Sequence, residues 1–138
     1  MKIVQGKLTP ELKKRIYEGF EEHALEQKGV SKKEDPVSFC IQDSKGELMS
    51  AVVCRMFWGA MHIKYVWTNK AYRGKGYASL LMQKAFDFAK ERKCPFAFVE
   101  TMNFQAPDFY KKLGFEVELV RNGFAEESSF YYMRKNFL

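Results

Sequence analysis

The feature that most constrains this chain is a change of periodicity near residue 76. Residues 61–68 are rich in β-branched and aromatic side chains, which predicts a strand, and a loop with Gly74 and Gly76 follows. From residue 76 to 93 apolar side chains recur at spacings of four and three, which predicts a helix of about five turns. The side chains at these spacings are Tyr77, Leu81, Ala85 and Phe88. The chain therefore has to combine strands and helices in one fold.

A second long helix is predicted near the start of the chain, over residues 10–27. Thr9 offers a capping hydroxyl, and Pro10 stands at the first helical position, where its missing N–H costs nothing. Apolar side chains recur every four residues from Leu12, which predicts a face that packs on the rest of the fold. Gly29 is placed to end this helix.

The remaining pattern is mostly that of strands. We expect strands over residues 37–41, 48–57, 61–68, 95–101, 115–120 and 129–137, and a short helix from Pro107 to Gly114. Tight turns join the first three strands, which favours an antiparallel meander. The continuous apolar run at residues 95–101 predicts a strand that is buried on both faces. This order of elements indicates an α+β domain in which one central helix crosses between strands.

Length and composition limit the range of functions. Chains of 138 residues commonly form a single domain, so we expect one domain over residues 1–138. No window is apolar enough for a bilayer span and the first residues lack the apolar core of a secretion signal, so we expect a cytoplasmic protein with no membrane partner. Cys40, Cys54 and Cys94 are predicted to be reduced core thiols. With only two histidines and no C-x-x-C or H-x-x-x-H motif, we expect no metal site.

The loop before the central helix is the best place in the sequence for an anion, which the net charge of +6 favours as a partner. Gly74 and Gly76 leave the backbone open, Arg73 and Lys75 add positive charge, and the helix presents free N–H groups at its start. A flexible basic turn explains the same residues. Neither a Walker A loop nor a dinucleotide fingerprint is present, because no G-K-[ST] follows and Ser79 stands at the third glycine position.

Tyr110 lies in a second informative segment, one turn inside the short helix, where its phenol can donate a proton or pack in the core. Taken together, the two segments resemble the GNAT superfamily of N-acetyltransferases, and the resemblance covers residues 61–120. The residues that carry it are Arg73-x-x-Gly76-x-Ala78 and, after a helix and a strand, Asn103-x-x-Ala106-x-x-x-Tyr110-x-x-x-Gly114-Phe115.

The resemblance implies a fold, a cofactor and a set of binding residues. The fold is a three-layer α+β fold of the GNAT type, with a central mixed, mostly antiparallel sheet of about six or seven strands flanked by helices. The cofactor is acetyl-CoA, whose pantetheine arm pairs with the strand before the loop and whose pyrophosphate lies on the loop. The residues so implied are Val66, Trp67 and Thr68 for the arm, Arg73, Gly74, Lys75, Gly76, Tyr77 and Ala78 for the pyrophosphate, and Asn103 as a further contact.

The resemblance also implies direct attack of an amine on the thioester while both substrates are bound. Tyr110 matches the tyrosine that often protonates the departing thiolate, and a backbone N–H near Trp67 or Thr68 would meet the developing oxyanion. An alkylamine is almost fully protonated at pH 7, so a base or a desolvating pocket has to free its lone pair. Glu100, at the end of a predicted strand, is the candidate base. An exposed strand-end carboxylate, or one that pairs with a nearby lysine, fits the same position.

The sequence does not specify the acceptor. A primary amine of a small molecule is preferred, while a free amino acid and a protein amino group stay open. Acidic side chains that can attract a cationic amine stand at Asp43, Glu100, Glu126 and Glu127. An aromatic pocket can be lined by Trp58, His62, Tyr65, Trp67, Phe104 and Phe124, although core packing explains each of them.

Binding without catalysis and association with a partner chain are alternatives that fit parts of the same sequence. The competing class is a binding module without catalysis, and one form of it is a non-catalytic acyl-CoA-binding module. A nucleic-acid-binding module is not expected, since the basic residues are scattered along the chain. The apolar segment 130–133 can pair with a second copy in a homodimer, or it can be buried in the core.

Overall fold

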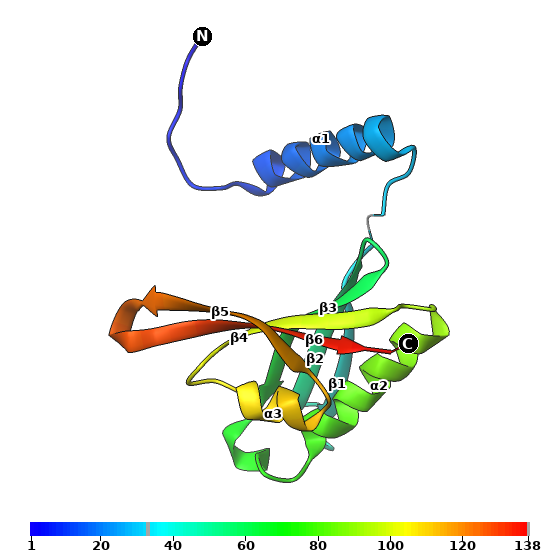
Figure 1. Ribbon diagram of the computed structural model, residues 1–138, viewed down its shortest axis with the longest axis vertical. Coiled ribbons are helices and arrows are strands. Elements are labelled where there is room, and N and C mark those ends of the chain that lie inside the picture. Colours follow the sequence, from blue (N-terminus) through cyan, green and yellow to red (C-terminus); the bar gives the residue numbers. More distant parts are fainter. Residues whose placement is uncertain (33, 138) are drawn as a thin grey trace. The chain divides into compact units, whose positions relative to one another are not determined.

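The computed structural model describes every residue of the chain except 33 and 138, and it divides into two compact units, residues 1–33 and residues 34–138 (Figure 1). The first unit holds helix α1 (Pro10–Lys28). As predicted, the Thr9 hydroxyl accepts a hydrogen bond from the Leu12 N–H, at 3.1 Å. Gly29 has φ 72° and donates its N–H to the Leu25 carbonyl at 2.9 Å, which ends the helix as predicted.

The apolar face of α1 has no partner within its own unit. Among the described residues of this unit, α1 is the only helix or strand, so the stripe that begins at Leu12 and continues through Ile16 and Phe20 has no second element there to cover it. Arg15 and Glu22 form an exposed ion pair on the helix at 3.7 Å, which contributes little to stability. That α1 packs on the rest of the fold stays a prediction.

The second unit is an open mixed sheet with two α-helices. Its six described strands lie in the order β1-β2-β3-β4-β6-β5, and all neighbours are antiparallel except β3 and β4. The elements are β1 (Val37–Gln42), β2 (Leu48–Phe57), β3 (Ala60–Thr68), α2 (Tyr77–Glu91), β4 (Phe96–Met102), α3 (Pro107–Lys112), β5 (Glu116–Phe124) and β6 (Ser128–Asn136). The predicted α+β fold with a mixed, mostly antiparallel sheet is confirmed.

The core of this unit lies between α2 and one face of the sheet. The helix buries five side chains, namely Leu81, Met82, Ala85, Phe86 and Ala89. On β4, Ala97, Val99 and Thr101 are buried, whereas the alternate side chains, Glu100 among them, are only partly buried. The prediction that this strand is buried on both faces is therefore wrong. Only one face of β4 is buried because successive side chains of a strand point to opposite faces and α2 covers one of these faces.

The last two strands form one long hairpin, which Figure 1 shows in orange and red. β5 continues to Phe124, four residues beyond the predicted end, and a short turn at Ala125–Glu127 leads into β6. β6 is hydrogen-bonded to β4 on one side and to β5 on the other. A second copy has no free edge to pair with at residues 130–133, so this proposed route to a homodimer is wrong. A homodimer itself stays a prediction.

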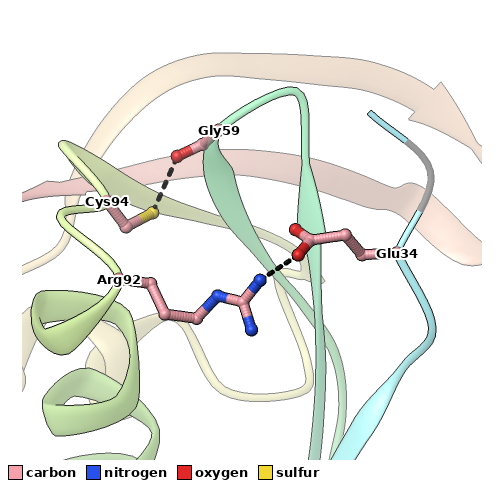
Figure 2. A network of polar contacts seen from close by, with 4 residues as sticks. All are labelled: Glu34, Gly59, Arg92 and Cys94. Atoms are coloured by element: carbon pink, nitrogen blue, oxygen red, sulfur yellow. Dashed lines mark hydrogen bonds and ion pairs between the residues drawn. The ribbon is translucent and has the colours of Figure 1, made fainter. Parts of the chain in front are cut away.

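The end of α2 is fixed by two polar contacts (Figure 2). Arg92 forms an ion pair with Glu34, and the Cys94 thiol donates to the Gly59 carbonyl at 3.1 Å.

Burial raises the pKa of Cys94, and burial together with the nearby Cys94 raises the pKa of Cys54 to about 11. Cys40 is exposed, so the prediction of a core thiol is wrong there. The alternation along β1 points Cys40 away from the buried face.

The three thiols should differ sharply in reactivity. With the folded protein at pH 8, we expect Cys40 to react rapidly with Ellman's reagent and Cys54 at least about 100-fold more slowly, because burial and a pKa of about 11 suppress its thiolate. In urea all three thiols should react rapidly, because unfolding exposes them to the reagent. In the folded protein, Cys40→Ser should remove the fast phase of the reaction. A second fast thiol in the folded protein would contradict this burial.

The described residues contain neither a candidate membrane-spanning helix nor a cluster of metal ligands. None of the helices there has both the length and the apolar composition that crossing a bilayer requires. No three side chains of the His, Cys, Asp and Glu types come together there in a way that would hold a metal ion.

Candidate active site

The pairing between β3 and β4 opens partway along these strands. The two strands run parallel, and their register contains two rungs, Met61 with Ala97 and His62 with Phe98. Lys64 has no partner on β2, and such a bulge bends and twists a strand. In the described sheet, the rest of β3 has no neighbour on its β4 side. This open stretch contains the three residues predicted to pair with a pantetheine arm, Val66, Trp67 and Thr68.

The loop between β3 and α2 is anchored at Asn69. The Asn69 N–H donates to the Met49 carbonyl at 2.8 Å, and its side-chain oxygen accepts from the Ala71 N–H at 3.0 Å. These two bonds start a short 3-10 helix at Lys70–Tyr72. The loop therefore leaves the sheet in a defined direction.

Two glycines shape the end of the loop. Gly74 and Gly76 have φ values of 77° and 79°, a region that residues with a Cβ rarely adopt. A Cβ built at either position meets no atom within 4 Å, so the space beside this backbone is open. The Arg73 Nε donates to the Thr68 carbonyl at 3.1 Å, which folds this side chain back along the loop. An anion can approach the backbone here beside a positive charge.

The start of α2 is uncapped. Gly76 is the N-cap residue and offers no side-chain acceptor. The N–H groups of residues 74–79 donate to no acceptor among the described residues, and the next one, of Leu80, donates to the Gly76 carbonyl at 3.0 Å. A helix start with free N–H groups carries about half a positive charge and binds phosphate. Most of the residues predicted to bind the pyrophosphate, Arg73 to Ala78, lie in this stretch of free N–H groups.

Asn103 is bound to the last strand. Its N–H donates to the Ser129 carbonyl, and its side-chain oxygen accepts from the Ser129 N–H, both at 2.9 Å. These bonds fix the end of β4 against the start of β6. The side-chain oxygen is therefore used inside the fold, and only the amide NH₂ group is left for the predicted contact with a cofactor.

Tyr110 on α3 is both a core residue and a protonated phenol. Its side chain is 6% exposed, and its ring makes edge-on contacts with Phe109 and Phe115 at centroid distances of 5.1 and 5.5 Å. Burial raises the pKa of Tyr110 to about 12. The phenol therefore keeps its proton throughout the neutral range and can act as a hydrogen-bond donor there.

Glu100 is paired with a histidine across the opening between β3 and β4. The His62 Nε2 lies 2.7 Å from the Glu100 Oε2, and the side chains are 22% and 28% exposed. No lysine takes part in this contact, so the alternative that Glu100 pairs with a lysine is not what the structure has. The carboxylate is fixed by an imidazole at the point where the two strands begin to part.

Comparison with known proteins identifies the family. Residues 7–115 match the acetyltransferase (GNAT) family. This chain belongs to the GNAT acetyltransferases. The predictions of the family and of the N-acetyltransferase class are therefore confirmed. A relative, the blasticidin-S acetyltransferase of Streptomyces morookaense, is 35% identical over 53% of this chain and 54% of its own length. The chain spans little more than half the length of two of the curated relatives that it matches.

Solved acetyltransferase structures resemble the whole chain or most of it. An acetyltransferase of Agrobacterium tumefaciens has a TM-score of 0.88 at 24% identity, with 99% of this chain and 100% of that chain covered. A protein described as a streptothricin acetyltransferase of Bacillus anthracis, solved with acetyl coenzyme A, has a TM-score of 0.67 at 23% identity. The match covers 78% of this chain and 65% of that one. At these identities the likeness shows the fold.

A hollow of about 440 Å³ lies beside Glu100 in this GNAT chain. Its aromatic walls are Phe57, Trp58, Phe96, Phe98 and Tyr132, and its charged groups are Glu100, Glu118 and Arg134. Of the six aromatic residues predicted to line a pocket, Trp58 alone lines this one. The other five do not line this hollow, and that they line an aromatic pocket stays a prediction.

The acidic residues predicted to attract an amine do not all line this hollow. Glu100 lines the hollow, whereas the Asp43 carboxylate accepts the N–H groups of Lys45 and Glu47 and shapes the turn between β1 and β2. Sequence reasoning missed Glu118, which faces the hollow from β5. It also missed His62 as the partner of Glu100, and the register of two parallel strands, which brings the pair together, has no local sequence signal.

Proposed function

We propose that this chain transfers the acetyl group of acetyl-CoA to a primary amine of a small molecule, by direct attack while both substrates are bound. The observation that carries this proposal is the uncapped start of α2, where the N–H groups of residues 74–79 stand free at the end of the open strand β3. A free helix start beside Arg73 and Lys75 suits a pyrophosphate. The acetyl-CoA bound to a solved acetyltransferase of the same fold supports the assignment.

Each part of the cofactor has residues that suit it. The loop from Arg73 to Ala78 would bind the pyrophosphate, and the open edge of β3 at residues 66–68 would hydrogen-bond the pantetheine arm as a neighbouring strand does. The Asn103 amide NH₂ would add a contact at the end of β4. Bound acetyl-CoA supplies an activated thioester, and a free N–H near Trp67 or Thr68 would stabilise the negative charge that develops on its carbonyl oxygen.

Glu100 would act as the base that prepares the acceptor. Removal of a proton from the ammonium frees the nitrogen lone pair for attack, and a positioned carboxylate can contribute about 10²- to 10⁴-fold to the rate. Its partly exposed side chain lines the hollow, so an amine in the hollow can reach it. The His62 contact supports this role, because a carboxylate in a fixed position is the one that aligns best with an incoming ammonium.

Tyr110 would stabilise the departing thiolate. Its pKa of about 12 lies well above the ordinary value for a thiol, roughly 8.5, so complete transfer of the phenolic proton is uphill. A hydrogen bond from the phenol to the thiolate is favourable, since bonds to charged groups contribute roughly 1.5–3 kcal/mol. The thiolate can then take its proton from water.

Tyr110→Phe tests this role. We expect turnover to fall by about 10- to 100-fold, the equivalent of the lost hydrogen bond, while the Kd for acetyl-CoA changes less than threefold. The free energy of unfolding should change by no more than about 1 kcal/mol, because the ring and its packing are kept. Stopped-flow thiol release and calorimetry measure the two quantities. An unchanged turnover number would remove Tyr110 from the reaction.

The hollow favours a small acceptor. Its volume of about 440 Å³ falls within the range of small-ligand pockets, roughly 300–1,000 Å³. Its aromatic walls, with two carboxylates against one arginine, suit an amine on an apolar or aromatic group. Relatives named for blasticidin S and streptothricin support this preference.

We further propose that residues 1–138 form one domain, since the family match spans both units. The free thiols fit a reducing cytoplasm.

A thiol-release assay tests the proposal. Acetyl-CoA is mixed with 2-phenylethylamine, spermidine, free lysine, kanamycin, blasticidin S or a lysine-rich peptide, and the products are analysed by mass spectrometry. We expect acetylation of at least one small amine and faster thiol release than with acetyl-CoA alone. Acetylation of the peptide alone would replace the small acceptor by a protein amino group. Binding of acetyl-CoA without acetylation of any amine would favour the non-catalytic module.

A further inference from the structure

The contact between His62 and Glu100 lies at the last rung of β3 and β4 before these strands part. His62 is paired in register with Phe98, and Glu100 is two residues further along β4, on the same face as Phe98. The distance of 2.7 Å between Nε2 and Oε2 is that of a strong, charge-assisted hydrogen bond. An ionised carboxylate only accepts, so in that state the imidazole carries the hydrogen on Nε2.

The imidazole is itself firmly held. Its ring is stacked on Phe98 at a centroid distance of 4.6 Å and an interplanar angle of 9°. Phe98 in turn contacts the rings of Phe57 and Phe96 at 6.4 and 6.1 Å. The aromatic wall of the hollow therefore fixes the orientation of the His62 ring and, with it, the direction of the Nε2–H bond.

Among the described residues, no donor other than His62 forms a hydrogen bond with the Glu100 carboxylate. Arg55 lies opposite His62 on β2, but its Nε is buried and has no acceptor, and its guanidinium lies over the Phe57 ring at 5.6 Å. The imidazole occupies Oε2 of the carboxylate, which leaves Oε1 for a second partner. A Glu side chain without such a bond samples several rotamers, and ordering it on arrival of the substrate costs entropy.

We infer that His62 is a positioning residue, which holds the Glu100 carboxylate through Nε2–H so that Oε1 faces the amine in the hollow. This inference rests on the proposed function. In the step concerned, an N–H bond of the ammonium breaks, its electron pair stays on nitrogen, and the proton forms an O–H bond at Oε1. His62 neither gains nor loses a proton in this step, and Glu100 later releases its proton to water.

Two substitutions of His62 separate the hydrogen bond from the bulk of the ring. Leucine at position 62 removes the donor, while glutamine keeps an N–H donor on a flexible side chain. With acetyl-CoA and the small amine that the wild type acetylates fastest, we expect His62→Leu to lower kcat at least 30-fold, with the acceptor KM and the acetyl-CoA Kd changed less than threefold. His62→Gln should restore kcat to within about fivefold of the wild type. His23→Leu, on α1, is the matched control.

A double substitution tests whether the two residues act as a unit. If His62 works only through Glu100, the variant with both His62→Leu and Glu100→Gln should be no slower than Glu100→Gln alone. Additive losses in kcat would overturn the inference, as would a kcat for His62→Leu within threefold of the wild type. Equal losses for the glutamine and leucine variants would also overturn it, because the donor would then be irrelevant.

A spectroscopic measurement detects the bond without any acceptor. The chain has two histidines, so ¹⁵N NMR of the His23→Gln variant reports the His62 ring alone. Where that ring is neutral, we expect the tautomer with hydrogen on Nε2, and a change in its nitrogen shifts in Glu100→Gln. The other tautomer would overturn the inference while leaving the proposed function intact. Absence of acetyl-CoA binding and thiol release in the wild type would overturn both together.

Discussion

Gly76→Val is expected to abolish acetyl-CoA binding while the fold persists. Gly76 has φ 79°, where a residue with a Cβ is strained by roughly 1–2 kcal/mol. A Cβ there meets no protein atom, so it would point into the open space beside the free N–H groups of the loop. A branched side chain in that space both blocks the pyrophosphate and disturbs the start of α2. Calorimetry should show at least a 100-fold weaker Kd.

Gly46→Val provides the matched control for this substitution. Gly46 has φ 82° and a Cβ there also meets no atom, but this glycine lies in the turn between β1 and β2, outside the loop that leads into α2. The same backbone strain should therefore leave the acetyl-CoA Kd within about threefold of the wild type. Normal binding by Gly76→Val, or equal losses in the two variants, would contradict the assignment of the pyrophosphate to this loop.

Glu100→Gln is expected to lower kcat by about 10²- to 10³-fold with little change in acetyl-CoA affinity. The substitution keeps the size of the side chain and its contact with His62, but an amide cannot accept a proton from an ammonium. The loss expected for a positioned base is of this size. Thiol release at saturating acetyl-CoA measures kcat, and calorimetry measures the Kd for acetyl-CoA.

Glu118→Gln separates proton transfer from simple attraction of a cation. Glu118 lines the same hollow from β5 but is not bound to His62. If it only attracts the amine, its loss should raise the acceptor KM by a few fold and leave kcat almost unchanged. A loss of kcat in Glu118→Gln equal to that in Glu100→Gln would mean that the charge of the hollow matters and that Glu100 is not the base.

Local sequence signals predicted the elements of this fold well. The cap at Thr9, the end at Gly29 and the helical spacing after Gly76 depend on neighbours in the chain, and the structure has all three. The burial of β4 was predicted less well. Whether an apolar strand is covered on one face or both depends on helices elsewhere in the chain, and local composition does not report that.

The candidate site was predictable only where one segment forms it. The loop at residues 73–78 is continuous in sequence, so its glycines, basic residues and helix start could be seen together. The contact between His62 and Glu100 joins residues 38 positions apart through the register of parallel strands. The hollow gathers side chains from β4, β5 and β6 and from the turn at Trp58. Contacts of this kind between distant segments can be found only from the tertiary structure.

Thermal unfolding with and without acetyl-CoA tests most directly the claim that this chain binds acetyl-CoA at the start of α2. Acetyl-CoA at a hundred times its Kd should stabilise the wild type by about 2.7 kcal/mol, which raises the unfolding temperature by several degrees. The Gly76→Val variant should show no shift, and Gly46→Val should show the wild-type shift. An unfolding temperature of the wild type that does not change at millimolar acetyl-CoA would contradict the account.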